Sequence, residues 1–314
     1  MAEMDLKLAE WALDIAKKSG ATATEVLLVS GESLSAGVRL GEVEKLKSSR
    51  ERRLGLRVFS GQSSATSSTA EIEQDSLKDF IKSTVDLAKL TAPDPWSGLP
   101  EASLHPKSFP ELELEDNTHR IIEAPKALEL ARAAEKAALA SDPRIKNSEG
   151  AEFDSGTYRV IFANSQGFAG EYAGTNYHLG IAPIAQDDSG MQVGYWYTSS
   201  RRYDALDDAE QVGIIAAKRA LRRLGARKIK TTRVPIVFDA QTAAGLIHTM
   251  ASAASGPSLY KGASFLVDKL NQSVASSNVT LIDDARMTGG LGSKPFDGEG
   301  LATNRKHLVE KGEL

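Results

Sequence analysis

The sequence contains no cysteine among its 314 residues. Disulfide bonds, thiolate metal sites and cysteine nucleophiles are therefore excluded. It also lacks an uninterrupted run of about 18 apolar residues, which a membrane-spanning helix needs. The first residues have the spacing of an amphipathic helix and not the pattern of a secretion signal. We therefore expect a cytoplasmic protein without a membrane segment, in which any metal ion would need His, Asp or Glu ligands.

A strong excess of one charge is also missing, because 38 Lys and Arg residues face 42 Asp and Glu residues, for a formal net charge of −4. Such a balance gives no general attraction to nucleic acid, so we expect no nucleic-acid partner. Basic residues do gather between positions 219 and 233. We interpret them as the solvated end of a helix, where cations suit the helix dipole.

Hydrophobic residues make up 41% of the chain, which is typical of a globular protein with a real core. Apolar spacing of three and four residues predicts helices at Met4–Lys18, Ser76–Leu90, Pro125–Ala140 and Ala209–Leu224. Short β-type runs, separated by glycines, predict strands at Glu25–Ser30, Ser35–Leu40, Leu54–Phe59, Ser63–Thr69, Tyr158–Ala163, Thr175–Ile184 and Met191–Ser199. The proline-rich stretch 92–123 between them predicts an extended connection.

The last part of the chain shows weaker patterns. It predicts a strand at Val234–Phe238, a helix at Ala240–Ala254 with Asp239 as its N-cap, a short helix at Ser264–Ser273 and a strand at Val279–Asp283. The fold class expected is α+β: residues 1–230 form a domain of helices packed on antiparallel sheets, and residues 231–314 begin a β-rich C-terminal domain. The ending near the turn Lys311-Gly312 suggests that this second domain is incomplete.

Three stretches together resemble the TldD/PmbA family, proteins once described as modulators of DNA gyrase and now regarded as peptidases. They are Leu54–Gly61, Val234–Asp239 and the glycine-rich stretch Gly289–Gly300, which runs on into the hairpin-like tail 301–314. The glycine-rich stretch is the most specific of the three. The resemblance covers nearly the whole chain.

In the TldD type of this family, a helix carries a His-Glu-x-x-x-His motif that holds a zinc ion, with the glutamate as general base. The corresponding helix here has His248 at the first ligand position, but Thr249 stands at the position of the base and Ala253 at that of the second ligand. Neither residue can perform that chemistry. The resemblance is therefore to the PmbA type, also called TldE, which lacks the zinc motif.

This resemblance implies a non-catalytic subunit of a metallopeptidase complex that degrades or trims small unfolded peptides. It implies no cofactor in this chain and zinc in a partner subunit, with which the chain would form a heterodimer, or a homodimer when alone. One alternative is a stand-alone peptide-binding or structural module. A second alternative, regulation of DNA gyrase, would need an affinity for duplex DNA that the charge balance does not favour.

Two interpretations of the loop 288–300 remain open at the level of sequence. It could bind an extended peptide, with contacts from Ser293, Phe296, Asp297, Gly298, Glu299 and Gly300. It could instead be a packing element that joins parts of the protein. The acids in and before the loop, Asp283, Asp284, Asp297 and Glu299, fit a hard cation or simple turn formation.

Overall fold

The computed structural model describes residues 2–119 and 122–314. Within this part, the chain forms two compact units. Unit 1 comprises Met1–Ala226 and Thr288–Thr303, and unit 2 comprises Arg227–Met287 and Asn304–Leu314. The glycine-rich loop, although flanked in sequence by unit 2, therefore belongs to unit 1. Positions 120–121 of the expected connection 92–123 lie outside the described residues.

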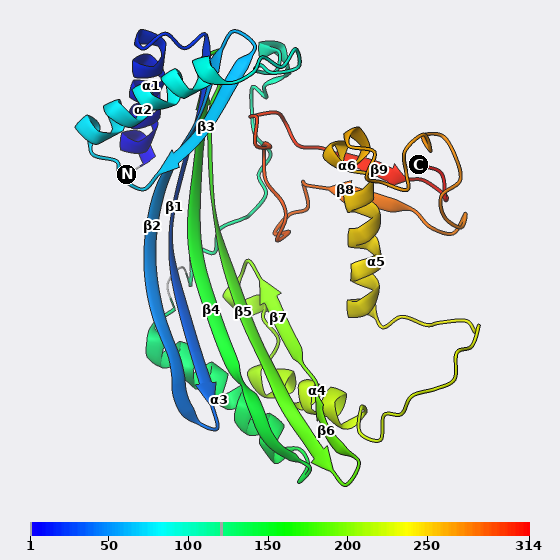
Figure 1. Cartoon of the computed structure of the whole chain (residues 1–314). Coiled ribbons are helices and arrows are strands. Elements are labelled where there is room, and N and C mark those ends of the chain that lie inside the picture. The colour runs from blue at the N-terminus through cyan, green and yellow to red at the C-terminus, as the bar shows by residue number, and fades with distance from the viewer. Residues whose placement is uncertain (1, 120–121) are drawn as a thin grey trace. The chain divides into compact units, whose positions relative to one another are not determined.

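Unit 1 is built on one antiparallel sheet of long, curved strands (Figure 1). The strand order is β3-β2-β1-β4-β5-β6, and β7 also pairs with β5. The strands are β1 (Ala23–Arg39), β2 (Glu42–Ser60), β3 (Ser63–Thr69), β4 (Ile145–Asn164), β5 (Ala169–Asp187), β6 (Gly190–Val193) and β7 (Trp196–Ser200). The helices of this unit are α1 (Ala2–Lys18), α2 (Gln74–Leu90), α3 (Ala124–Ala140) and α4 (Ala209–Leu221), with short 3-10 turns at Ala102–Leu104 and Tyr203–Ala205.

All four helices cover the same face of the sheet, in two pairs at its two ends. In β1, Val26 and Leu28 belong to the apolar core under α1 and α2, whereas Ala36 and Val38 belong to the core under α3 and α4. These four residues are all even-numbered, and alternate residues of a strand point to the same face. No described helix of unit 1 packs on the other face of the sheet, which carries the odd-numbered residues of β1. We call it the open face.

The sequence predicted the helices of unit 1 well, because their apolar faces are buried without interruption. Ala127, Ala131, Ala134 and Ala138 of α3 are all fully buried, as an alanine stripe suited to close packing requires. The α+β fold class with antiparallel sheets is confirmed.

The strands are longer than the sequence predicted. The runs Glu25–Ser30 and Ser35–Leu40 are parts of a single strand, β1, which continues through Gly31. Gly31 does not end the strand. It lets the backbones of β1 and β4 approach closely, because a Cβ atom there would lie 2.5 Å from the carbonyl oxygen of Thr157 on β4. Conversely, the predicted strand Met191–Ser199 is divided into β6 and β7 at Gly194, where a Cβ would collide with the backbone of α4.

Unit 2 contains α5 (Ala240–Ala253), α6 (Gly256–Tyr260) and the antiparallel pair β8 (Leu281–Asp284) and β9 (Arg305–Val309). The N-cap prediction is confirmed, since the Asp239 carboxylate accepts a hydrogen bond from the backbone N–H of Gln241 at 3.2 Å. Lys311 and Gly312 both have positive φ, as a tight hairpin turn requires.

Two predictions for unit 2 were wrong. Val234–Phe238 forms no strand, because no described segment pairs with it and Pro235 cannot donate to a ladder. Ser264–Ser273 forms a series of turns instead of a helix, with Asp268 and Asn271 at positive φ. The described helices include none whose length and apolar character would let it span a bilayer.

Candidate functional site

The helix that resembles the zinc helix of the family is α5, and its side chains are exposed or only partly covered within the described structure. His248 is exposed, and its Nε2 atom lies 3.4 Å from the Ser252 hydroxyl oxygen. Thr249 donates its hydroxyl hydrogen to the carbonyl oxygen of Gly245 at 2.8 Å. Ala253 offers no side-chain ligand atom.

These residues do not fit a catalytic zinc. A single imidazole cannot replace the three protein ligands of such a site. Across the described ranges 2–119 and 122–314, no three His, Asp or Glu side chains gather closely enough to hold a metal ion. We therefore derive no reaction step through a metal on this chain.

The glycine-rich loop Thr288–Thr303 packs on the open face of the sheet in unit 1. Its anchor is the side chain of Phe296, which is 1% exposed and contacts Phe162, Phe168 and Tyr172 from β4, β5 and their connection. The Phe296 ring meets those of Tyr172 and Phe168 edge-on, at centroid distances of 5.1 and 5.7 Å. Such aromatic contacts add to the gain from burial, so this cluster fixes the middle of the loop.

A second anchor is Arg201, which follows β7 and is 5% exposed. Its guanidinium donates to the carbonyl oxygens of Gly290 and Leu291 in the loop, at 3.3 and 2.6 Å. It also donates to the Tyr158 hydroxyl and to the carbonyl oxygen of Thr175, at 2.5 and 3.2 Å. The planar guanidinium thus joins two sheet strands to the loop, a geometry that lysine cannot reproduce.

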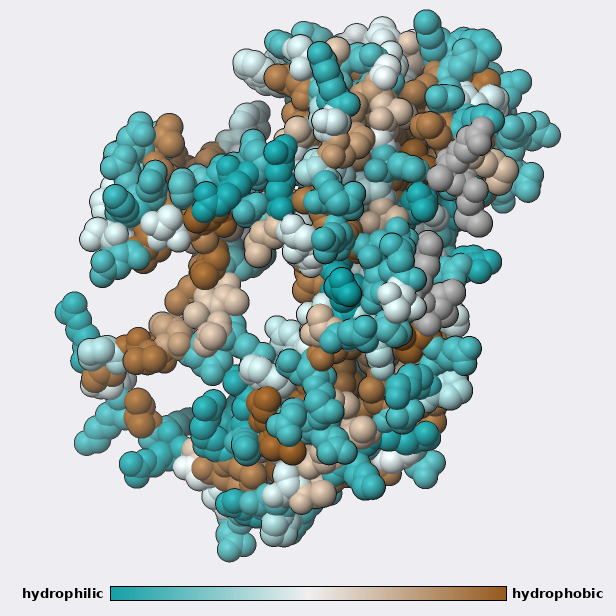
Figure 2. Space-filling model, turned by 180° about the vertical axis from the view of Figure 1, so that it is seen from behind, coloured by the Kyte–Doolittle hydropathy of each residue, from teal (hydrophilic) through white to brown (hydrophobic). Residues whose placement is uncertain are grey.

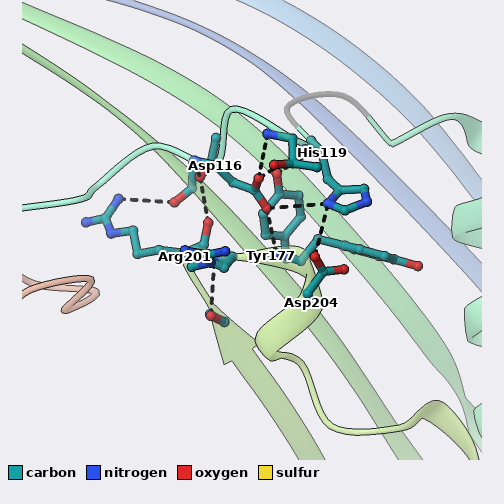
Figure 3. A network of polar contacts seen from close by, with 10 residues as sticks. Asp116, His119, Tyr177, Arg201 and Asp204 are labelled. Atoms are coloured by element: carbon teal, nitrogen blue, oxygen red, sulfur yellow. Dashed lines mark hydrogen bonds and ion pairs between the residues drawn. The ribbon is translucent and has the colours of Figure 1, made fainter.

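A polar network holds Arg201 in place (Figure 3). The Thr175 hydroxyl donates to the carbonyl oxygen of Arg201 at 2.6 Å. The same hydroxyl oxygen accepts a hydrogen bond from the backbone N–H of Asp116 at 2.8 Å. On the same segment, the Tyr177 hydroxyl donates to the carbonyl oxygen of His119 at 2.5 Å. Asp116 and His119, in the last part of the connection 92–123, are therefore tied to β5 and to the end of β7.

Asp116 is the charged centre of this network. Its carboxylate accepts the backbone N–H groups of Tyr203, His119 and Thr118, at 2.9, 3.0 and 2.9 Å. Burial opposes ionisation, but these three bonds outweigh it and place the pKa of Asp116 below its ordinary value. The stabilisation from Asp116 is therefore present above the unfolded pKa and lost as the pH falls through the folded pKa.

The tip of the loop is held by polar contacts from distant parts of unit 1. Arg57 on β2 lies 3.3 Å from the Glu299 carboxylate and 3.4 Å from that of Glu25. Burial raises the pKa of Glu25, and the charge of Arg57 opposes that rise. The Nδ1 atom of His105 lies 3.1 Å from the carbonyl oxygen of Gly300. No sequence pattern predicted these contacts of Arg57 and His105 with the loop.

The six residues that the sequence predicted for peptide binding divide into three groups. Ser293, Phe296 and Gly300 are buried in the packing of the loop. Asp297 is partly buried and accepts the backbone N–H groups of Glu299 and Leu301, so it shapes the turn. Gly298 and Glu299 are exposed. This geometry favours the packing interpretation. Arg201, one of the two anchors of the loop, was not identified from the sequence.

The two glycines at the tip of the loop provide a matched test. Gly300 has φ +77°, and a Cβ atom there would lie 2.7 Å from the Phe168 ring, whereas a Cβ at Gly298 would meet nothing within 4 Å. We expect Gly300→Ala to lower the free energy of unfolding by about 1–3 kcal/mol, from backbone strain and overpacking. Gly298→Ala should change it by less than about 0.5 kcal/mol. Urea unfolding checks both values.

Equal stabilities for the two variants would contradict the packing described for Gly300. If Gly298→Ala weakened peptide binding while leaving stability unchanged, the exposed tip would have the binding role that the sequence suggested.

Comparison with known proteins places these features in a family. Three family profiles match the chain: PmbA/TldA metallopeptidase domain 1 at residues 24–88, the central domain at residues 118–224 and the C-terminal domain at residues 231–314. A metalloprotease PmbA homolog from Haemophilus influenzae is 36% identical over 313 residues, which are 99% of this chain and 69% of that protein. Metalloprotease PmbA from Escherichia coli O157:H7 is 32% identical over 305 residues, 96% of this chain and 67% of that protein.

Solved structures agree with these matches. A proposed modulator of DNA gyrase from Bacteroides thetaiotaomicron superposes with a TM-score of 0.93 at 31% identity, covering 99% of this chain and 71% of that one. TldE from Thermococcus kodakarensis has a TM-score of 0.86 at 20% identity, covering 98% of this chain and 68% of that one, and so supports the fold alone. The chain belongs to the PmbA/TldD family of metallopeptidase-like proteins.

Proposed function

We propose that this chain is the non-catalytic, PmbA-type subunit of a cytoplasmic metallopeptidase complex that trims small unfolded peptides. The observation that carries the proposal is the composition of α5, where Thr249 and Ala253 stand at the positions that the zinc-bearing relatives use for the base and the second ligand. In this arrangement zinc and the general base come from a TldD-like partner. The chain itself contributes binding surface and no reacting group.

Exposed apolar side chains in unit 2 support pairing. Val237 is 97% exposed, and other large apolar side chains of the segment before α5 and of α5 itself are more than 40% exposed, namely Val234, Ile236, Phe238, Leu246 and Ile247. The apolar surface of the extended segment that leads into α5 is visible in Figure 2. Apolar surface of this extent is typical of protein contacts. The partner we propose is the zinc-bearing relative, with a homodimer when the chain is alone.

Metal analysis of the purified chain tests the first part of this proposal. We expect zinc well below one ion per chain, and no change on replacing His248 with alanine, because one imidazole does not hold zinc. Zinc at one ion per chain that disappears in His248→Ala would contradict the assignment to the metal-free type.

A stand-alone peptide-binding module is the second candidate, and the open face of the sheet favours it. It differs from the first in requiring no zinc-bearing partner. Light scattering of the chain with and without the TldD-like relative separates the two, since only the subunit model gains mass on mixing.

A further inference from the structure

A row of polar side chains crosses five strands on the open face of the sheet. The residues paired directly across β2, β1, β4, β5 and β7 are Lys47, Ser35, Asp154, His178 and Ser199. The next row toward α3 and α4 contains Lys45, Gly37, Glu152, Gly180 and Tyr197. Directly paired residues share one face, so these side chains point to the same side. Nothing described so far uses this cluster.

The cluster borders open space. Two cavities on this face, of about 320 and 620 Å³, share Lys45 and Asp154 in their walls. Gly180 keeps the space beside His178 free, because a Cβ there would lie 3.0 Å from the Nε2 atom of His178. The other ring nitrogen, Nδ1, is engaged with the Ser199 hydroxyl at 2.8 Å. His178 therefore presents one ring nitrogen toward the cavity that Asp154 also lines.

The carboxyl pair in this cluster is short of a proton. The Ser35 hydroxyl oxygen lies 2.5 Å from a Glu152 oxygen and is also in hydrogen-bond contact with Asp154. A serine hydroxyl has one proton to donate, so it can satisfy only one of two ionised carboxylates. Lys45 pairs with Glu152. If Ser35 donates its proton to Glu152, its contact with Asp154 requires a proton on Asp154 or a cation from outside.

The pKa directions agree with this hydrogen count. Burial raises the pKa of Asp154, and the charge of the neighbouring Glu152 raises it further. Burial also opposes ionisation of Glu152, but hydrogen bonds from Lys45 and Ser35 outweigh it and lower the pKa of that group. Of the two carboxyl groups, Asp154 is therefore the one whose protonation the surroundings favour.

We propose that this cluster binds the primary ammonium group of an extended peptide, with Asp154 as its anionic partner and His178 and Tyr197 beside it. The ammonium donates to the Asp154 carboxylate and to the Nε2 atom of His178. Tyr197, which is 42% exposed and lies 5.4 Å from the His178 ring, offers its aromatic face to the cation.

A protonated amine fits better than a metal ion, because the described residues include no group of three His, Asp or Glu side chains with metal-ligand geometry. The larger cavity continues from Asp154 along β1 and β4 to Val29. Six residues of strand separate Ser35 from Val29, which both line this cavity, or roughly 20 Å at about 3.3 Å per residue. This length suits an extended peptide, and the peptide nature of the ligand rests on the proposed function.

The sign of the pH dependence follows from the proton exchange. The ionised form of Asp154 binds the ammonium, so affinity should rise as the pH rises through the raised pKa of Asp154, and binding should release protons below it. The titratable groups that face Asp154 are Lys45 and Lys47 on β2, Glu152 on β4 and His178 on β5.

Calorimetry with the isolated 314-residue chain tests the proposal without a partner, so its result is independent of whether the subunit pairs. The ligands are trialanine amide with a free amino end, N-acetyl-trialanine amide, and N-acetyl-Ala-Lys-Ala amide. We expect acetylation to weaken binding of trialanine by about tenfold or more, as expected for loss of a charge-assisted hydrogen bond. Titration in two buffers of different ionisation enthalpy should show proton release.

Asp154→Asn should abolish the preference for the free amine, whereas the exposed Asp188→Asn, which removes the same charge outside the cluster, should keep it. Stronger binding of the lysine peptide than of the acetylated trialanine, lost in Asp154→Asn, would identify a side-chain amine as the source of the ammonium. Equal binding of all three peptides, or none at about 10 mM, a limit that corresponds to less than about 3 kcal/mol, would overturn the proposal.

Discussion

Replacement of Arg201 by methionine is expected to release the glycine-rich loop from the sheet. The change removes the donors for the carbonyl oxygens of Gly290, Leu291 and Thr175 while keeping most of the apolar stem. The buried Thr175 acceptor left without a donor costs about 1–3 kcal/mol, and the two partly buried loop acceptors cost less each, so the free energy of unfolding should fall by about 3 kcal/mol in total. Arg201→Lys should recover only part of this loss. A single ammonium group cannot donate at once to the two loop carbonyls and to the Tyr158 hydroxyl, as the planar guanidinium does.

Hydrogen exchange shows whether the loss is local. Backbone amides in 288–303 should exchange at least about tenfold faster in Arg201→Met, whereas β1 and β2 should be affected less. Arg202→Met is the matched control, since Arg202 is the exposed neighbour and its replacement should leave both exchange and stability unchanged. Loop amides that exchange at the wild-type rate in Arg201→Met would show that the guanidinium does not hold the loop.

The helices and strands that are buried on one side could be predicted from the sequence, because such burial imposes a periodic pattern of apolar residues. The alanine stripe of α3 and the alternating residues of β5, such as Tyr177, Leu179 and Ile181, are buried as their spacing predicts. The charged half of β2 was missed, because Glu42 to Arg53 is largely solvated and its pairing with β1 leaves no apolar pattern. Backbone pairing alone, without burial, has no sequence signature.

The candidate sites were less predictable, because they depend on contacts between distant residues. Arg201 and Gly290 are 89 positions apart, and Ser35 and Asp154 are 119 apart. Neither pair belongs to a motif. The glycine-rich pattern drew attention to the loop, but its glycines did not reveal that Gly300 is packed against Phe168 while Gly298 is open. The prediction at Val234–Phe238 failed for another reason. Its apolar, β-type residues indicated a strand, but no described strand pairs with this segment.

The largest effect expected of the proposed function concerns catalysis. The chain alone should show no chelator-sensitive peptide hydrolysis, because α5 lacks the base and the second ligand. Addition of a TldD-like relative with an intact His-Glu-x-x-x-His helix should raise hydrolysis of an unfolded peptide by about 100-fold or more over this chain alone, the scale of a positioned general base. His248→Ala in this chain should leave the rate of the mixture unchanged, since His248 is exposed and holds no reacting group.

The most direct test of this account is therefore the rate of peptide hydrolysis by the chain alone, by the zinc-bearing relative alone and by their mixture, with zinc counted in each sample. We predict zinc and the base on the relative, no hydrolysis by this chain alone, and a mixture that is insensitive to His248→Ala. Hydrolysis by this chain alone, accompanied by bound zinc and abolished by both a chelator and His248→Ala, would contradict the account.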